Sequence, residues 1–218
     1  MQNSSVEVAI QDGCLFRQRG VLRPFGLHDV IFQQDSGCRS LYRVKDGLLA
    51  LRRYHRDGGR TVVRVVRPGE TVGWADAFIS GVHRWEGWAL SSGSLWCLPA
   101  ADWISGHSDG ALSSTLALAF AETKQLENAV LRLSYLTAEQ RLLAFLLSLA
   151  DRPDQYPVMV RSPVRRADLA EVIAIRPESY SRAMSRLQDR GLVKWTAPDT
   201  ILIEQRAVAM VAEVIDLF

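Results

Sequence analysis

The residues between Asp109 and Leu136 place apolar side chains at alternating steps of four and three, which is typical of a long amphipathic helix. The positions are Leu112, Leu116, Ala119, Thr123, Leu126, Val130 and Leu133. They form an a/d stripe over about three heptads. A helix from Gly110 to Ser134 would span roughly 38 Å, which is more than a small domain needs for its internal packing.

Such a stripe is either a buried core helix or the seam of a homodimer. We favour the homodimer, because the region before the stripe has apolar faces of its own and leaves the stripe little else to cover. Residues 109–136 are therefore predicted to be a dimerisation helix. Thr137-Ala-Glu-Gln140 has the form of a capping box, so the chain should turn at Leu136 and a new helix should run to about Asp151.

The region from about Val21 to Leu98 consists of short apolar or alternating runs between turn signals, which indicates an all-β region of hairpins. The turns are marked by Asp46-Gly47, Asp57 to Gly59 and Pro68-Gly69. Pro99 fits the first position of a short helix through Trp103, because its missing N–H is not needed there. Residues 1–108 are predicted to form this β domain, and the fold class of the whole chain to be α+β.

The segment after Pro153 has the pattern of a winged helix-turn-helix. A strand near Val158 to Arg161 precedes a helix, and a second helix opens at Pro177 and closes at Gly191, with a short turn at residues 174–176 between the two. "LVKW", the turn-forming "TAPDT" and "ILI" then predict a hairpin, the wing. We expect residues 137–218 to form this domain.

Charge in this segment points to nucleic acid. Residues 161–195 hold eight basic and four acidic residues, whereas the net charge of the whole chain is only +2. A solvated helix face with i,i+4 ion pairs is the alternative, but the basic surplus coincides with the helix-turn-helix pattern. In such a unit the start of the second helix enters the DNA major groove. The predicted DNA contacts are Arg165, Arg166, Arg176, Glu178, Ser179, Ser181, Arg182 and Arg186.

A β-roll with DG and PG turns, a long helix and a winged helix-turn-helix ending in "PESYSRAMSRLQDRGLV" resembles the CRP/FNR superfamily of bacterial transcription regulators. The motif Glu178-x-x-Ser181-Arg182 is similar to the FNR-like subgroup. The resemblance implies that these three residues read a TTGAT-type half-site, with Arg182 bidentate on guanine and Glu178 accepting from cytosine N4. It also implies a homodimer on a palindrome, a cyclic-nucleotide-binding-like β-roll, and RNA polymerase as a further partner.

The β-roll departs from the nucleotide-binding members of that family. Gly73 is present, but Trp74 stands where the ribose-binding Glu is expected, and Arg84 is followed by Trp85 instead of Ser or Thr. We therefore predict no high-affinity binding of cAMP or cGMP, and the effector is unknown. The tryptophans of the β-roll either line an apolar effector pocket or serve as packing. A third alternative is a filled pocket and a regulator that acts without any effector.

An iron–sulfur cluster needs four thiolates, and this chain has three Cys without an N-terminal cluster of them. Haem remains a candidate cofactor, because Pro-Glu-Ser-x-Ser-Arg-x-Met resembles the recognition segment of the nitric-oxide-responsive Dnr-like regulators. This resemblance implies a haem-based gas or redox sensor as an alternative. The candidate ligands are His28, His55, His83, His107, Cys14, Cys38 and Cys97. No other metal site is expected, since the chain has no CxxC pair.

Other functional classes are disfavoured. GxSxG, P-loop, GxGxxG and HExxH motifs are absent, so we expect no enzyme. A scaffold protein would keep the dimer stripe but would give no reason for Glu178, Ser181 and Arg182 at their positions. The sequence has neither a membrane span nor a secretory signal, so a cytoplasmic location without a membrane partner is expected.

Overall fold

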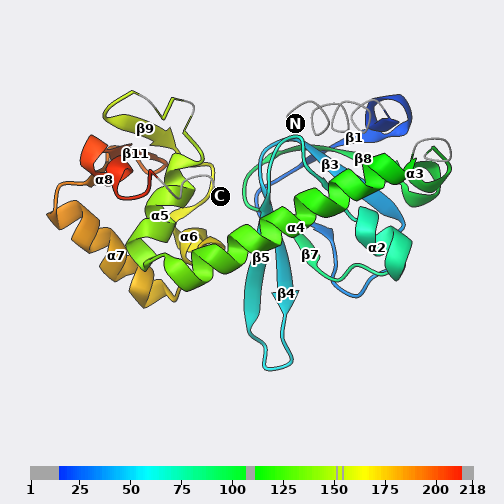
Figure 1. The fold of residues 1–218 in the computed structure, drawn as a ribbon, viewed down its shortest axis with the longest axis horizontal. Coiled ribbons are helices and arrows are strands. Elements are labelled where there is room, and N and C mark those ends of the chain that lie inside the picture. The colour runs from blue at the N-terminus through cyan, green and yellow to red at the C-terminus, as the bar shows by residue number, and fades with distance from the viewer. Residues whose placement is uncertain (1–14, 107–110, 151, 154, 213–218) are drawn as a thin grey trace. The chain divides into compact units, whose positions relative to one another are not determined.

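The computed structural model describes residues 15–106, 111–150, 152–153 and 155–212 (Figure 1). The chain divides into two compact units, residues 1–123 and residues 124–218, which we call the N-terminal unit and the C-terminal unit. The division falls within a single long helix, α4 (Ala111–Tyr135). Strands followed by helices confirm the predicted α+β class.

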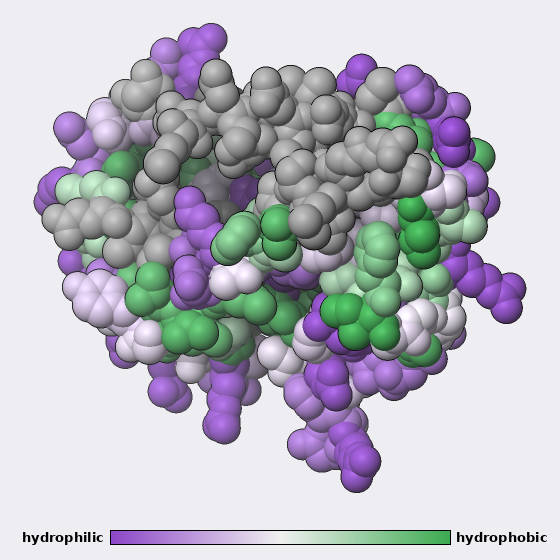
Figure 2. Space-filling view, turned by 45° about the vertical axis from the view of Figure 1, so that its right-hand side comes forward, coloured by the Kyte–Doolittle hydropathy of each residue, from purple (hydrophilic) through white to green (hydrophobic). Residues whose placement is uncertain are grey.

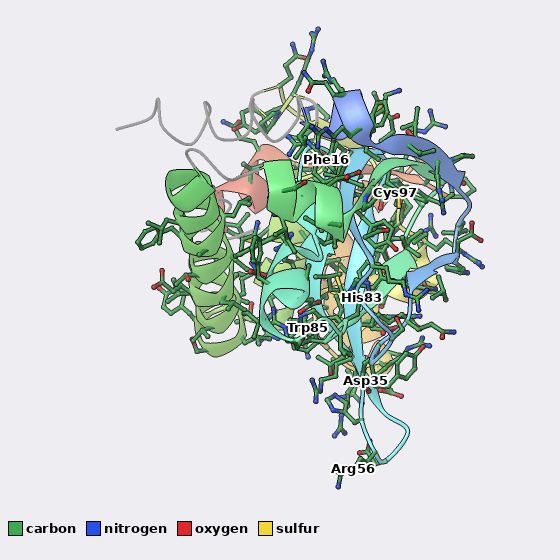
Figure 3. All side chains as sticks on the ribbon, turned by 90° about the vertical axis from the view of Figure 1, so that its right-hand side faces the viewer. Phe16, Asp35, Arg56, His83, Trp85 and Cys97 are labelled. Atoms are coloured by element: carbon green, nitrogen blue, oxygen red, sulfur yellow. The ribbon has the colours of Figure 1, made fainter. Side chains whose placement is uncertain are left out.

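Two four-stranded antiparallel sheets build the described part of the N-terminal unit, in the orders β1-β8-β3-β6 and β2-β7-β4-β5. The strands are β1 (Val21–Phe25), β2 (Val30–Phe32), β3 (Ser40–Asp46), β4 (Leu49–Tyr54), β5 (Arg60–Val66), β6 (Thr71–Val72), β7 (Glu86–Ala89) and β8 (Gly93–Pro99). The β4–β5 hairpin projects from the sheets, with Arg56 at its tip (Figure 3). The Asp57–Gly59 turn closes the predicted hairpin, β4–β5, but the turns at Asp46-Gly47 and Pro68-Gly69 join strands of different sheets, so the hairpins predicted there are wrong.

Apolar side chains from the two sheets meet in one core, formed by Phe25, Phe32, Val44, Leu49, Leu51, Val66, Val72, Ala89, Leu95 and Cys97. A second cluster joins the sheets to the neighbouring helices and contains Phe16, Leu41, Trp74, Ala75, Leu98 and Trp103. Leu118 and Ala119 of α4 pack against this second cluster. The first half of α4 is thereby held on the β-roll by buried apolar surface.

The C-terminal unit contains the predicted winged helix-turn-helix. Its elements are α5 (Ala138–Leu147), β9 (Val158–Arg161), α6 (Arg166–Val172), α7 (Pro177–Asp189), β10 (Val193–Trp195), β11 (Thr200–Ile203) and α8 (Gln205–Ala209). The strands form a sheet in the order β10-β11-β9. The capping box of Thr137 and Gln140 is confirmed. Gly191, at a φ of 63°, ends α7 as predicted, since Leu192 N donates to Leu187 O.

Four further details of the sequence prediction are wrong. A helix, α2 (Trp74–Ile79), interrupts the region predicted to be all-β, because Gly73 at a φ of 90° turns the chain out of β6. Pro99 ends β8, and α3 (Ala100–Gly106) begins one residue later. The helix expected to reach Asp151 stops at Leu147, where the backbone tightens into turns. The turn between α6 and α7 begins at residue 173, one residue earlier than predicted.

Candidate nucleic-acid interface and effector pocket

The helix α7 separates its side chains into a buried face and an exposed face. Ala183, Met184 and Leu187 are buried. The predicted base-reading residues Glu178, Ser181 and Arg182 are exposed, as is Arg186, while Ser179 is half-buried. The apolar face of α7 therefore packs inside the unit, and the polar face of its first two turns is open to a ligand.

The start of α7 also favours an anion. Arg176 is the N-cap residue in an extended conformation, and Pro177 occupies the first turn. The N–H groups of a helix's first turn have no partner within the helix, and the helix dipole is positive at that end. Exposed Arg176 and Arg182 add two cationic side chains to the same end.

Some arginines of the C-terminal unit are held by carboxylates. Arg161 Nε donates to Asp199 Oδ2 at 2.8 Å. Arg186 and Arg190 both bind Glu139 of α5, at 3.5 and 3.2 Å. Arg186, a predicted DNA contact, thus has a partner within the chain, although its side chain stays exposed.

A second group of arginines is available. Among the described residues, no carboxylate lies within ion-pair distance of Arg165, Arg176 or Arg182. Arg166 is held without a carboxylate: its guanidinium lies 3.8 Å from the ring centre of Trp195, and Nη2 donates to Ala197 O at 2.9 Å. The wing therefore orients Arg166 at the start of α6 and leaves its charge uncompensated.

The predicted dimer stripe is largely exposed along α4. Leu116, Leu126, Val130 and Leu133 are 47, 55, 64 and 54% exposed, and Thr123 is exposed too. Ala119 is half-buried against the second core cluster, and the side chain of Leu112 lies outside the described residues. Phe120, which was not part of the stripe, is 71% exposed. Figure 2 shows hydrophobic residues between hydrophilic ones on the face that it displays. Apolar surface of the extent found on α4 indicates an interface.

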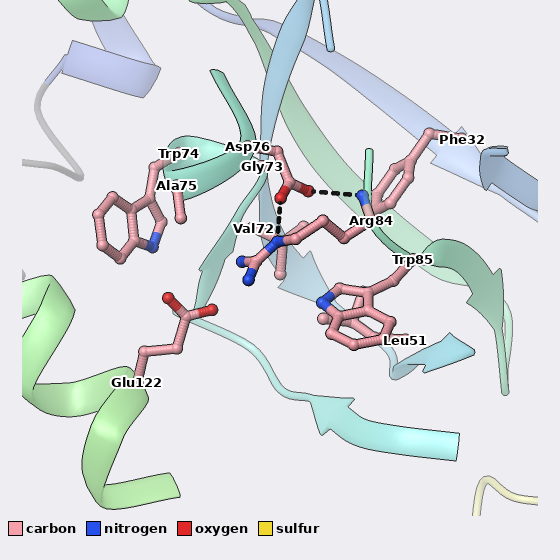
Figure 4. A pocket seen from close by; sticks show the side chains of 10 residues that line it. All are labelled: Phe32, Leu51, Val72, Gly73, Trp74, Ala75, Asp76, Arg84, Trp85 and Glu122. Carbon is pink, nitrogen blue, oxygen red and sulfur yellow. Dashed lines mark hydrogen bonds and ion pairs between the residues drawn. The ribbon is translucent and has the colours of Figure 1, made fainter. Parts of the chain in front are cut away.

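The four residues predicted for the effector pocket line one cavity in the N-terminal unit. Gly73, Trp74, Arg84 and Trp85 share it with Phe32, Leu51, Val72, Ala75, Asp76 and Glu122. The Arg84 guanidinium lies between the two indoles (Figure 4). Its Nε donates to Asp76 Oδ1 at 2.6 Å, and the Arg84 backbone N–H donates to Oδ2 at 3.3 Å. The remaining free volume is about 20 Å³, which is room for about one water molecule.

Asp76 is the anchor of this pocket. Burial by itself raises the pKa of this carboxyl, but the neighbouring His83 ring, the hydrogen bonds that Arg84 donates and the charge of Arg84 outweigh burial and lower the pKa below the ordinary value. Asp76 is therefore ionised at neutral pH and compensates the charge of Arg84. On the α4 side of the pocket, Glu122 lies 4.0 Å from Arg64.

Each described histidine among the candidate haem ligands has a neighbour within the chain. The His28 ring stacks on Trp88, and His55 Nε2 lies 2.9 Å from Thr61 Oγ1. His83 is buried beside Phe32, with Nδ1 3.7 Å from Asp76. His107 and Cys14 lie outside the described residues.

Cys38 and Cys97 are buried free thiols. Burial, together with the charge of Asp76, raises the pKa of Cys38 to about 11, which keeps this thiol protonated and a poor metal ligand at neutral pH. Within the described ranges, no three His, Cys, Asp or Glu side chains gather as a metal site.

Sequence reasoning missed three residues that shape these sites. Asp76 and Glu122 line the pocket. Glu122 is distant from Arg84 in sequence, and no motif links Asp76 to Arg84 although they are eight residues apart. Glu139 lies within the capping-box segment, which indicated its helix and not its pairing with α7. An acidic residue close to Arg84 in a turn-rich segment was the one available signal for Asp76.

Comparison with known proteins identifies both units. A cyclic nucleotide-binding domain matches residues 22–106, and a Crp-like helix-turn-helix domain matches residues 140–208. The nitrogen fixation regulation protein FixK of Azorhizobium caulinodans is 26% identical over 189 residues, which cover 84% of this chain and 75% of that protein. The fumarate and nitrate reduction regulatory protein of Escherichia coli is 26% identical over 176 residues, or 78% of this chain and 70% of that protein.

Among solved structures, FixK2 from Bradyrhizobium japonicum has the same fold, with a TM-score of 0.72 at 22% identity, over 91% of this chain and 96% of that chain. The two matched domains, in this order, define a transcription regulator with a nucleotide-binding-type β-roll and a helix-turn-helix. The chain belongs to the CRP/FNR family of transcription regulators. Within the described part of the chain, no helix combines the length and the apolar character that a membrane crossing requires.

Proposed function

We propose that the chain is a homodimeric, sequence-specific DNA-binding regulator that recognises a TTGAT-like palindrome in the cytoplasm. The observation that carries the proposal is the exposed polar face of α7, where Glu178, Ser181 and Arg182 lie beside one another and Arg182 has no carboxylate partner among the described residues. An unpaired arginine can bind guanine O6 and N7 with both branches of its guanidinium. As a regulator of transcription, the chain has RNA polymerase as a further proposed partner.

The exposed stripe on α4 supports the dimer. Leu126, Val130 and Leu133 are each more than half exposed, and a second copy of the same helix would cover them in a twofold seam. A twofold dimer presents two copies of α7 to half-sites about 34 Å apart. The operator is therefore a palindrome.

The pocket argues against cAMP as the effector. In this chain the Arg84 guanidinium already binds Asp76 through Nε at 2.6 Å, so its charge is compensated before a cyclic phosphate arrives. Trp74 is buried in the second core cluster and offers no carboxylate for a ribose. The free volume of about 20 Å³ is far too small for a nucleotide.

Fluorescence anisotropy with three labelled duplexes tests the proposed function: a TTGAT-type palindrome, the same duplex with one half-site scrambled, and a fully scrambled duplex. We expect the palindrome to bind about 10³-fold or more tighter than the fully scrambled duplex, with affinities that fall steeply with salt. Equal affinity for all three duplexes would contradict sequence-specific reading.

A further inference from the structure

The junction between α4 and α5 leaves two carbonyl groups without their helical donors. In a continuous helix, the N–H of Thr137 would bind Leu133 O and the N–H of Gln140 would bind Leu136 O. The capping box redirects both donors. Thr137 N donates to Gln140 Oε1 at 3.1 Å, and Gln140 N donates to Thr137 Oγ1 at 3.3 Å.

The side chain of Arg141 takes the place of these donors. Its Nη2 donates to Leu133 O at 2.9 Å, and its Nε donates to Leu136 O at 3.1 Å. Its third hydrogen bond is to a residue outside the α4–α5 junction: Nη1 donates to Ala174 O at 3.3 Å. Burial lowers the pKa of Arg141, but the guanidinium stays charged and offers its five N–H donors in a fixed plane.

Ala174 lies in the turn between α6 and α7, so this third contact reaches the helix-turn-helix directly. Its φ of 55° is in the left-handed region, which few residues other than glycine adopt. The turn is closed by Ala174 N donating to Glu171 O and Ile175 N donating to Ala170 O. Because this turn sets the direction in which α7 leaves α6, a hydrogen bond to its carbonyl connects that direction to the end of α4.

Neighbouring residues of the same turn of α5 strengthen the connection. Glu139 binds Arg186 and Arg190 on α7, and Gln140 Nε2 donates to Met210 O. The first turn of α5 thus contacts α7 through Glu139 and the end of α8 through Gln140. Arg141 adds the contacts that reach back to α4.

We propose that Arg141 is a positioning residue that holds α7 at a defined angle to the C-terminal end of α4, and thereby determines which half-site spacing the regulator accepts. The inference rests on the proposed function, because it requires a dimer joined through α4 that reads a palindrome. Each inserted base pair moves the half-sites apart by about 3.4 Å and rotates one relative to the other by roughly 35°. A dimer with fixed recognition helices rejects such a change, and a dimer with a loose junction tolerates it.

The test uses the full-length chain and a set of palindromes with identical half-sites and central spacers that differ by one and two base pairs, together with a duplex carrying a single half-site. The variants are Arg141→Lys, which keeps the charge but cannot bridge three carbonyls, and Arg141→Ala. Arg206→Ala, an exposed arginine of α8 in the same unit, is the matched control. Sedimentation and thermal melting accompany the binding curves.

We expect the unmodified chain and Arg206→Ala to prefer one spacer by at least about tenfold over its neighbours. In Arg141→Lys this preference should fall below about threefold, while single half-site affinity stays within about twofold and the chain stays dimeric. Arg141→Lys with an undiminished spacing preference overturns the inference. So does a loss of single half-site affinity as large as the loss on the palindrome, which indicates general damage. If the unmodified chain is monomeric or ignores the palindrome, the proposed function itself fails.

Discussion

The arginine of the pocket and the arginines proposed to contact DNA differ in their partners. In the N-terminal unit, Arg84 of the pocket is paired with Asp76, and Arg52 and Arg64 of the sheet beside it are paired with Glu86 and Glu70. In the C-terminal unit, Arg165, Arg176 and Arg182 face solvent, and no described carboxylate lies within ion-pair distance of them.

The difference shows where each unit can still bind an anion. A guanidinium that already has a buried carboxylate partner has its charge compensated and gains less from a phosphate. An exposed and unpaired guanidinium exchanges only water and counterions for a DNA phosphate or a guanine edge. The C-terminal unit is therefore ready for DNA, whereas the pocket of the N-terminal unit has compensated its own charge.

The contrast between the units would not hold if a single copy of the chain bound the operator as tightly as the dimer. Leu126→Asp places a charge in the α4 stripe and should separate the dimer. Loss of the second half-site contact should weaken palindrome binding by about 10²–10⁴-fold. Sedimentation and anisotropy measure the two effects.

Leu131→Asp is the matched control for this variant, because Leu131 is also exposed on α4 but lies at an outward b position of the heptad. It should remain dimeric and bind normally. A dimeric Leu126→Asp variant would show that the seam is placed wrongly.

Arg182→Ala tests whether the unpaired arginine reads a base. We expect a loss of about 1–3 kcal/mol on the TTGAT palindrome, because one bidentate contact to guanine is removed. The same variant should no longer distinguish that G·C pair from A·T, whereas the unmodified chain should. If discrimination at every position survives, Arg182 does not read the sequence.

The sequence was sufficient for the fold and for the outward face of α7, because both depend on local periodicity and capping. The a/d spacing predicted α4, the Thr137–Gln140 box predicted the start of α5, and Pro177 with Gly191 predicted the ends of α7. These signals act over a few residues, so they can be recognised without knowledge of the tertiary structure.

The pairing of charges could not be predicted in this way. Arg52 and Glu86 are brought together by the sheets, and Arg141 and Ala174 by the helix-turn-helix, over separations of 34 and 33 residues that no local pattern reports. The helix α2 was missed for a related reason. Its six residues are too few to show helical periodicity, and it begins at the left-handed Gly73.

Asp76→Asn tests the charge pairing in the N-terminal unit. The variant removes the anion that holds Arg84, and we expect a loss of about 1–2 kcal/mol of stability, since Arg84 is half exposed and solvent compensates part of the pair. Tryptophan fluorescence follows this unit, which contains Trp74, Trp85, Trp88, Trp96 and Trp103. Asp46→Asn, at an exposed carboxylate of the same unit, should change little.

The same pair predicts a pH dependence. The pKa of Asp76 lies below its ordinary value of 3.8 in the folded chain. Its ionised form therefore stabilises the fold at pH above that value, and the contribution is lost as the pH falls through the lowered pKa. The melting temperature of the unmodified chain should drop more steeply below about pH 4 than that of Asp76→Asn. Identical acid profiles would show that Asp76 does not stabilise the unit.

Arg165→Ala should have the smallest effect. A phosphate contact carries no sequence information, so all duplexes should weaken alike and the log–log salt slope should decrease by about 1. Arg161→Ala is the control, because Arg161 is paired with Asp199 and should change the slope less. Equal slopes for Arg165→Ala and the unmodified chain would place Arg165 outside the DNA interface.

The most direct test of the account is the affinity of the ligand-free chain for the TTGAT-type palindrome, measured by anisotropy without cAMP and again at saturating cAMP. We predict specific binding without ligand and the same affinity with cAMP, because Arg84 is already paired with Asp76 and the pocket has about 20 Å³ free. Operator binding that appears only with cAMP would contradict the account, since it would require the pocket to open for a nucleotide.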